Sequence, residues 1–151
     1  MSVTVYILKI RIKSESGIWR RIAVRADQTL VDLHHGICNS FGYECDENVG
    51  YVFSLPPEGR SGTARKWLSI LYTSPEIYHH FEEMPFKILN AERFTFEQLR
   101  LKSRYKFEYE CGRDNPELWR QHLISVEKDD AGNIADSYPA ELEGRGVPLS
   151  L

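Results

Sequence analysis

His34 and Cys38 stand four residues apart in a stretch with helical periodicity, so both side chains fall on one face of a helix. Imidazole nitrogen and thiolate sulfur are zinc ligands, and this spacing offers two of the four that a structural zinc site needs. Further ligands would have to come from Cys45, Cys111, His79 or His80. The alternative is that His34 borders an apolar stripe and Cys38 is a small buried residue. Because no Cys-x-x-Cys pair accompanies them, we favour this alternative and expect no metal and no other cofactor.

Cys111 stands two positions before Arg113, in a segment (111–116) that we predict to be a turn. A neighbouring cation lowers the pKa of a thiol and makes it a better nucleophile. Catalysis by a cysteine–histidine pair would also need a histidine such as His122 within hydrogen-bond reach. The alternative role for Cys111 is packing, and no catalytic residue can be assigned from these spacings.

Trp19, Arg20 and Arg21 begin a predicted strand, so the two arginine side chains point to opposite faces. Arginine binds carboxylates and phosphates bidentately, so one of them could form a site for an anion or an acidic partner. The other would stack on Trp19 or pair with Asp32 or a nearby glutamate. We favour a structural ion pair that connects the hairpin to the helix. We expect Trp19 to lie in the core, where truncation to alanine costs a few kcal/mol.

Three cations (Lys9, Arg11 and Lys13) line one face of the first predicted strand, and aromatic residues alternate along segment 105–109. Together they could form a basic, aromatic platform for nucleic acid. However, 19 Lys and Arg against 22 Asp and Glu give the 151-residue chain a net charge of −3. A nucleic-acid partner is therefore disfavoured, and we interpret the cations as a solvated face that protects a sheet edge.

Two alternating stretches, 3–13 and 18–24, predict an antiparallel hairpin across the turn 14–17. A helix should follow at about 29–41, because Thr29 is an N-cap residue, Asp32 completes a capping box and Gly42 supplies the stop. Its apolar stripe repeats at spacings of three and four, through Leu30, Leu33, Ile37 and Phe41.

The elements predicted after this helix follow one another in a less regular order. Segment 51–55 indicates a strand, 66–72 either strand or helix, 75–84 a helix, 86–89 a short strand and 95–99 a short helix. Strands at 105–110 and 119–128 precede a polar turn at 129–133. Because strands and helices do not alternate, we predict an α+β fold: a mostly antiparallel sheet with the 29–41 helix on one face and a β-grasp-like start. Residues 1–128 form a single domain, and 129–151 form a tail packed on it or frayed from it.

Three blocks of the chain resemble the plasmid pRiA4b ORF-3-like family. The first and most specific runs from Ile18-Trp19-Arg20-Arg21-Ile22 through Thr29-Leu30-Val31-Asp32-Leu33-His34 to Phe41-Gly42-Tyr43, where Tyr43 replaces the family's tryptophan. A second block covers 105–114, Trp119 and Val126-Glu127. A third comprises Tyr138-Pro139, Leu142-Glu143-Gly144 and Gly146. The resemblance implies a fold and a small cytosolic bacterial or archaeal domain, and no reaction.

The chain also departs from the family pattern. The family often carries His-Leu-x-x-Phe after Phe-Gly-Trp, and segment 49–53 keeps only the aromatic end. Cys111 stands where the family usually has Phe, which favours packing as its role. Three residues, Pro116-Glu117-Leu118, are inserted before Trp119, and 147–151 replaces the family's Cys-Pro-Pro-Glu-Asp tail. A polar or metal site that relatives build from these positions would be incomplete here.

Composition further limits the function classes. Apolar residues make up 42% and charged residues 27%, as in ordinary globular domains. Three cysteines are an odd number, which disfavours a disulfide-stapled secreted fold. No run approaches the roughly 18 apolar residues of a membrane span, and segment 1–5 lacks signal-peptide features. We therefore expect a cytoplasmic protein without a membrane partner.

These observations together favour a non-enzymatic module that binds a protein or peptide, through an exposed sheet edge. The alternative is a small enzyme or ligand-binding domain with a polar site around Trp19, Arg20, His34 and Asp114. A third reading, suggested by the family name, is a plasmid- or mobile-element-associated nucleic-acid accessory protein. The candidate binding residues are Trp19, Arg20, Arg21, His34, Tyr43, Tyr109 and Asp114.

Overall fold

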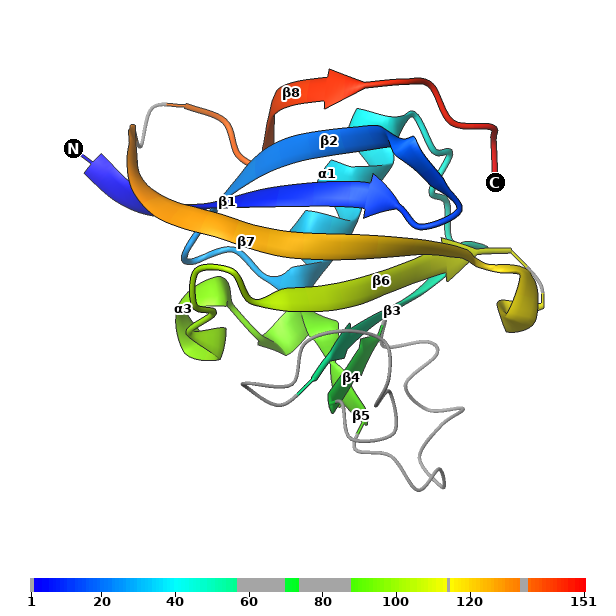
Figure 1. The fold of residues 1–151 in the computed structure, drawn as a ribbon. Coiled ribbons are helices and arrows are strands. Elements are labelled where there is room, and N and C mark those ends of the chain that lie inside the picture. Colours follow the sequence, from blue (N-terminus) through cyan, green and yellow to red (C-terminus); the bar gives the residue numbers. More distant parts are fainter. Residues whose placement is uncertain (1, 57–69, 74–87, 114, 134–135) are drawn as a thin grey trace.

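The computed structural model describes residues 2–56, 70–73, 88–113, 115–133 and 136–151. Within these residues the fold is α+β, an eight-stranded mixed sheet with one main helix, α1, across one face (Figure 1). The strand order is β5-β4-β3-β6-β7-β1-β2-β8. The strands are β1 (Ser2–Ile12), β2 (Glu15–Arg25), β3 (Gly50–Leu55), β4 (Ile70–Thr73), β5 (Ile88–Asn90), β6 (Lys106–Gly112), β7 (Arg120–Asn133) and β8 (Ala140–Arg145). The helical elements are α1 (Leu30–Phe41), η3 (Ala91–Arg93), α3 (Phe96–Leu99) and η4 (Pro116–Leu118).

The predicted hairpin is confirmed, since β1 and β2 pair antiparallel from Val5 opposite Arg25 to Arg11 opposite Trp19. Alternation decides which face of β1 is buried, because successive strand side chains point to opposite faces. Leu8 and Ile10 are completely buried under α1, whereas Lys9 is half-buried on the opposite face of the sheet. The face that α1 does not cover is the one seen from the front in Figure 1.

The predicted helix is also confirmed, including both of its ends. The Thr29 hydroxyl accepts a hydrogen bond from the Asp32 backbone N–H, and the Asp32 carboxylate accepts one from the Thr29 backbone N–H. This reciprocal pair satisfies donors that the first helical turn leaves open. At the other end Gly42 adopts φ 75°, a left-handed conformation that glycine takes without steric cost. Leu33 and Ile37 are fully buried against the sheet.

Two predicted turns need correction. Segment 129–133, predicted as a polar turn, is the end of β7 and pairs with β1 from Asp129 opposite Tyr6 to Asn133 opposite Ser2. The long β1 supplies backbone partners that outweigh the turn preference of these polar residues. Cys111, predicted in a turn, lies within β6 opposite Tyr51. Residues 140–145, part of the predicted tail, form β8 and pair with β2.

The remaining segments are described in part. The ambiguous stretch 66–72 overlaps β4, whose residues 70–73 pair antiparallel with β3 and parallel with β5. The predicted helix at 75–84 lies outside the described residues, as do His79 and His80. None of the helices in the described ranges has the length and apolar character needed to cross a membrane.

Candidate functional site

A chain of polar side chains lies buried between α1 and the sheet, centred on Tyr109 of β6. The Tyr109 hydroxyl is 2.6 Å from Nδ1 of His34 on α1. Nδ1 of His122, on β7, lies 3.2 Å from the Tyr109 carbonyl oxygen, to which only an N–H can donate. Nε2 of His122 therefore accepts from the Tyr43 hydroxyl at 2.8 Å. Three predicted site residues, His34, Tyr43 and Tyr109, are thus brought together, and His122 joins them.

Burial sets the protonation of this cluster. It lowers the pKa of His34 to about 3, with a smaller contribution from the nearby charge of His35. It lowers the pKa of His122 to about 4 and raises that of Tyr43 to about 12. The cause in each case is that a buried group loses the hydration of its charged form. The cluster is therefore uncharged at neutral pH.

Cys111 borders this cluster but has the wrong environment for a nucleophile. Burial raises the pKa of its thiol to about 11, against the opposing effect of a hydrogen bond from Tyr109. The side chain is fully buried, and reactive cysteines are instead partly exposed thiolates in electropositive surroundings. These properties favour the packing role of Cys111 over a cysteine–histidine mechanism.

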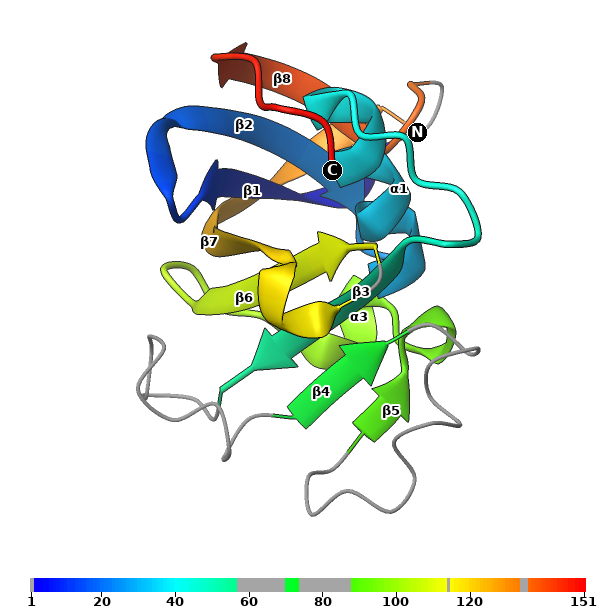
Figure 2. The same cartoon turned by 90° about the vertical axis from the view of Figure 1, so that its right-hand side faces the viewer.

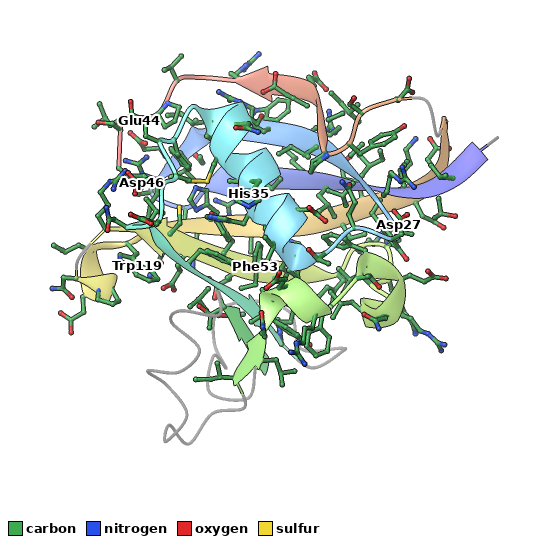
Figure 3. All side chains as sticks on the ribbon, turned by 180° about the vertical axis from the view of Figure 1, so that it is seen from behind. Asp27, His35, Glu44, Asp46, Phe53 and Trp119 are labelled. Carbon is green, nitrogen blue, oxygen red and sulfur yellow. A yellow bond between two sulfur atoms is a disulfide. The ribbon has the colours of Figure 1, made fainter. Side chains whose placement is uncertain are left out.

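The structure joins Cys38 and Cys45 in a disulfide, a pairing that the odd cysteine count did not predict. Cys38, interpreted from the sequence as a small apolar residue, is thus covalently bound to the loop that follows α1. The two sulfurs and a ring nitrogen of His34 lie within 4.8 Å of one another. The disulfide is visible beside α1 near the labelled Asp46 in Figure 3.

Arg20 and Arg21 do point to opposite faces, and both have structural partners. The Arg20 guanidinium donates to the backbone carbonyls of Trp19, Ser40, Arg145 and Gly146 and lies 3.2 Å from the Glu141 carboxylate. It therefore connects β2 to the end of α1 and to β8. This contact set agrees with the preferred expectation of a structural arginine between hairpin and helix, although the helical partner is a carbonyl.

The other arginine lies on the uncovered face of the sheet. Arg21 pairs with Glu127 and Glu143 and stacks over the Trp19 ring, with its guanidinium carbon 5.4 Å from the ring centroid. The Lys9 ammonium lies over the same ring at 4.7 Å. Trp19 is only half-buried, so the expectation that it belongs to the core is wrong. A tryptophan on a sheet face between two cations is stabilised by cation–π contacts instead.

Of the remaining candidates, Asp114 lies outside the described residues. Phe107 and Tyr109 are buried on the helix-covered face, whereas Lys9 and Arg11 lie on the other. Bases stack on exposed rings, so these aromatics and cations do not form a shared platform.

A cleft of about 650 Å³ lies at the end of the sheet where β6 passes through η4 into β7. Lys13, Arg113, Leu118, Trp119 and Arg120 contribute to its lining. The β1–β2 turn and the C-terminal segment lie at this same end, on the right of Figure 1 and towards the viewer in Figure 2. Sequence reasoning did not find this cleft. The sequence feature that could have indicated it is the three-residue insertion before Trp119, which places the apolar Leu118 in an otherwise polar connection between β6 and β7.

Trp119 is the distinctive residue of this cleft. Its indole Nε1 is buried and has no hydrogen-bond partner among the described residues. The ring packs on Gly112, where an added Cβ would come within 2.6 Å of Trp119 Cδ1. Buried donors are nearly always paired in native proteins, so this N–H marks a position for an acceptor. Figure 3 shows Trp119 at the end of the sheet away from Asp27.

Cations outnumber anions in the lining. Lys13 pairs with Glu108 and Arg113 with Asp46, so the charge of these two is partly neutralised. The Arg120 guanidinium donates to the carbonyls of Leu149 and Ser150, and it has no carboxylate partner in the described part of the chain. The cleft therefore presents the Arg120 guanidinium, together with Glu117, beside an apolar surface.

Comparison with known proteins supports the resemblance seen in the sequence. The family model described as plasmid pRiA4b ORF-3-like protein matches residues 4–148. No curated protein matches the chain. Among solved structures, the chain is similar to MM3350 from Methanosarcina mazei Go1, a protein of unknown function, at 20% identity and a TM-score of 0.70. That similarity covers 99% of this chain and 74% of the other, and at this identity it establishes the fold alone.

Proposed function

The chain belongs to the plasmid pRiA4b ORF-3-like family, and from that premise we propose that it is a non-enzymatic module that binds a protein partner. In this proposal the binding site is the cleft around Trp119, and the ligand is an extended, acidic peptide segment of the partner. The observation that carries the proposal is the buried indole N–H of Trp119, which lacks an acceptor among the described residues. Because this N–H is buried, the Trp119 ring or its neighbours must shift on binding before a peptide carbonyl of the segment can accept from it.

The surroundings of Trp119 fit such an occupant. Leu118 is 81% exposed at the cleft, and Leu149, whose carbonyl binds Arg120, is 75% exposed. These two exposed apolar side chains offer contact area to a ligand in the cleft. Arg120 supplies a positive charge for an acidic side chain, and Arg is enriched at protein interfaces.

The neutral buried cluster around Tyr109 favours binding over catalysis. An acid–base mechanism needs groups that titrate near neutral pH, and burial moves both histidines away from that range. Arg20, a candidate for substrate binding, already donates to four backbone carbonyls. Its role in holding β8 supports a structural assignment.

We favour the cleft over strand addition at a sheet edge. β8 is an edge strand, but Glu141, Glu143 and Arg145 alternate along it, and its register with β2 is interrupted by a bulge. Charges and bulges on edge strands discourage pairing with another chain.

The finer description of the fold is also our proposal: a mostly antiparallel sheet with a β-grasp-like start, supported by the hairpin β1–β2 and α1. We likewise propose a cytoplasmic location, in which reducing conditions would keep the Cys38–Cys45 pair as thiols.

A displayed library of random peptides tests the proposal. We expect selection on the folded protein to enrich acidic peptides that carry an apolar residue. Their binding should weaken roughly tenfold or more in Leu118→Asp, because the new carboxylate removes apolar contact and repels an acidic ligand. Leu142→Asp is the matched control, since Leu142 is 53% exposed on β8. Equal weakening in both variants, or enrichment without acidic residues, would contradict the proposal.

A further inference from the structure

A second group of side chains, separate from the cleft, contains one histidine nitrogen and two cysteine sulfurs that could bind a metal ion such as zinc. His34 and Cys38 lie one turn apart on α1, and Cys45 returns to them from the loop after the helix. Their ring nitrogen and sulfur atoms lie within 4.8 Å of one another. His34 and Cys38 are buried, whereas Cys45 is half-buried. This is the ligand composition of zinc sites that bind two cysteines and one histidine.

The ring of His34 is held in a defined position by its neighbours. Tyr51 stacks on it at 3.8 Å between ring centroids with an interplanar angle of 16°, and the Tyr109 hydroxyl lies 2.6 Å from Nδ1. When Nδ1–H donates to Tyr109, the lone pair of Nε2 is available 4.0 Å from the Cys38 sulfur. Metal-binding histidines are typically oriented by such a hydrogen bond at the second ring nitrogen.

A tetrahedral ion at this position requires the two sulfurs to separate. Zinc bonds of about 2.3 Å to sulfur and 2.0 Å to nitrogen at tetrahedral angles place the S and N atoms about 3.5 Å apart. In the disulfide form Cys38 Sγ lies 3.9 Å from Nδ1 and 4.0 Å from Nε2 of His34, so the freed thiolate must move towards the Nε2 side to share an ion with it.

We propose that reduction of the Cys38–Cys45 disulfide creates a zinc site formed by His34, Cys38 and Cys45. In the reduction a dithiol supplies two electrons and two protons and closes to its own disulfide. The two protein thiols then bind zinc as thiolates, and their two protons pass to solvent. A water molecule completes the coordination on the side where Cys45 is half-buried. The oxidised disulfide and the zinc site exclude one another, because both use the same two sulfurs.

Cobalt binding tests the site directly. The full chain is reduced with a phosphine, which gives two electrons to the disulfide and takes an oxygen atom from water to become the phosphine oxide. The protein is then desalted without air before Co²⁺ is added. We expect one Co²⁺ per chain with thiolate-to-cobalt charge-transfer absorption, and stoichiometric Zn²⁺ should displace it. The oxidised protein should bind at least roughly 100-fold more weakly, because it lacks the two thiolates.

Two cysteine variants separate this site from adventitious binding. Cys45→Ser should weaken Co²⁺ binding roughly 100-fold, whereas Cys111→Ser should bind like the reduced wild type because it keeps all three ligands. Circular dichroism checks that both variants are folded. Alkylation gives an independent measure, since zinc should protect two thiols of the reduced wild type. Absence of Co²⁺ binding by the reduced protein, or binding unaffected by Cys45→Ser, would overturn the proposal.

Discussion

The hydroxyl of Tyr109 and Nδ1 of His34 lie 2.6 Å apart across 75 positions of sequence, and both side chains are buried. This hydrogen bond connects β6 to α1 within the buried layer between the helix and the sheet. It also determines which nitrogen of His34 can accept or bind another group. The stability of the fold and the proposed metal site therefore depend on the same contact.

Tyr109→Phe should lower the free energy of unfolding by about 1–3 kcal/mol, because it leaves a buried ring nitrogen of His34 unpaired. Urea unfolding followed by circular dichroism measures the change. Tyr6→Phe is a suitable control, since Tyr6 is half-buried and its hydroxyl has no hydrogen-bond partner among the described residues. It should change stability by less than about 0.5 kcal/mol. Similar losses in both variants would show that the Tyr109–His34 contact has no special weight.

The protein should lose stability as the pH falls from 6.5 towards 4. The folded state keeps His34 and His122 neutral down to pKa values of about 3 and about 4, whereas the unfolded chain protonates them near 6.5. The unfolded state therefore binds more protons in this window, and acid favours it. The loss is at most about 1.4 kcal/mol per pH unit for each histidine.

Unfolding free energies measured at pH 7, 6 and 5 check this dependence. His35→Gln is the control variant: His35 is exposed on α1, and losing its small effect on the pKa of His34 should leave nearly the same slope between pH 7 and 5. A stability that does not change between pH 7 and 5 would mean that the two buried histidines accept protons without unfolding.

Arg20→Lys should destabilise the protein by about 2–3 kcal/mol, because an ammonium group cannot satisfy four separate carbonyls in the geometry of a guanidinium. Residues 140–145 should also exchange amide hydrogens faster, since Arg20 binds the carbonyls of Arg145 and Gly146. Hydrogen exchange with mass spectrometry measures this. Arg21→Lys should cost less than about 1 kcal/mol, because its ion pairs are partly exposed. Equal effects from the two arginines would contradict the assignment of Arg20 as the connection to β8.

Trp19→Ala should cost only about 1–2 kcal/mol, since two cation–π contacts near the surface contribute about 0.5–1 kcal/mol each. Phe53→Ala, at a fully buried position, should cost about 3–5 kcal/mol. Thermal or urea unfolding of the pair distinguishes the two environments. A larger loss of stability for Trp19→Ala than for Phe53→Ala would show that Trp19 behaves as a core residue.

Local sequence patterns alone determined several elements of this protein. Alternation in β1 and β2 and the capping residues Thr29, Asp32 and Gly42 predicted the hairpin and α1, because these signals act over a few residues. The residue blocks from Ile18 to Tyr43 likewise indicated the family. The polar end of β7 was missed for the same physical reason, since its pairing with β1 joins segments more than 100 residues apart.

Only the tertiary structure decided how side chains from distant elements meet. Strand alternation placed Arg20 and Arg21 on opposite faces, but only packing against α1 and β8 shows that Arg20 is the buried one. Cys45 reaches Cys38 because the loop after Gly42 turns back, and loop direction has no periodic signal. The cleft at Trp119 is lined by the β1–β2 turn, by the link through η4 between β6 and β7, and by Leu151. Such sites depend on long-range contacts, which the spacing of residues along one segment cannot encode.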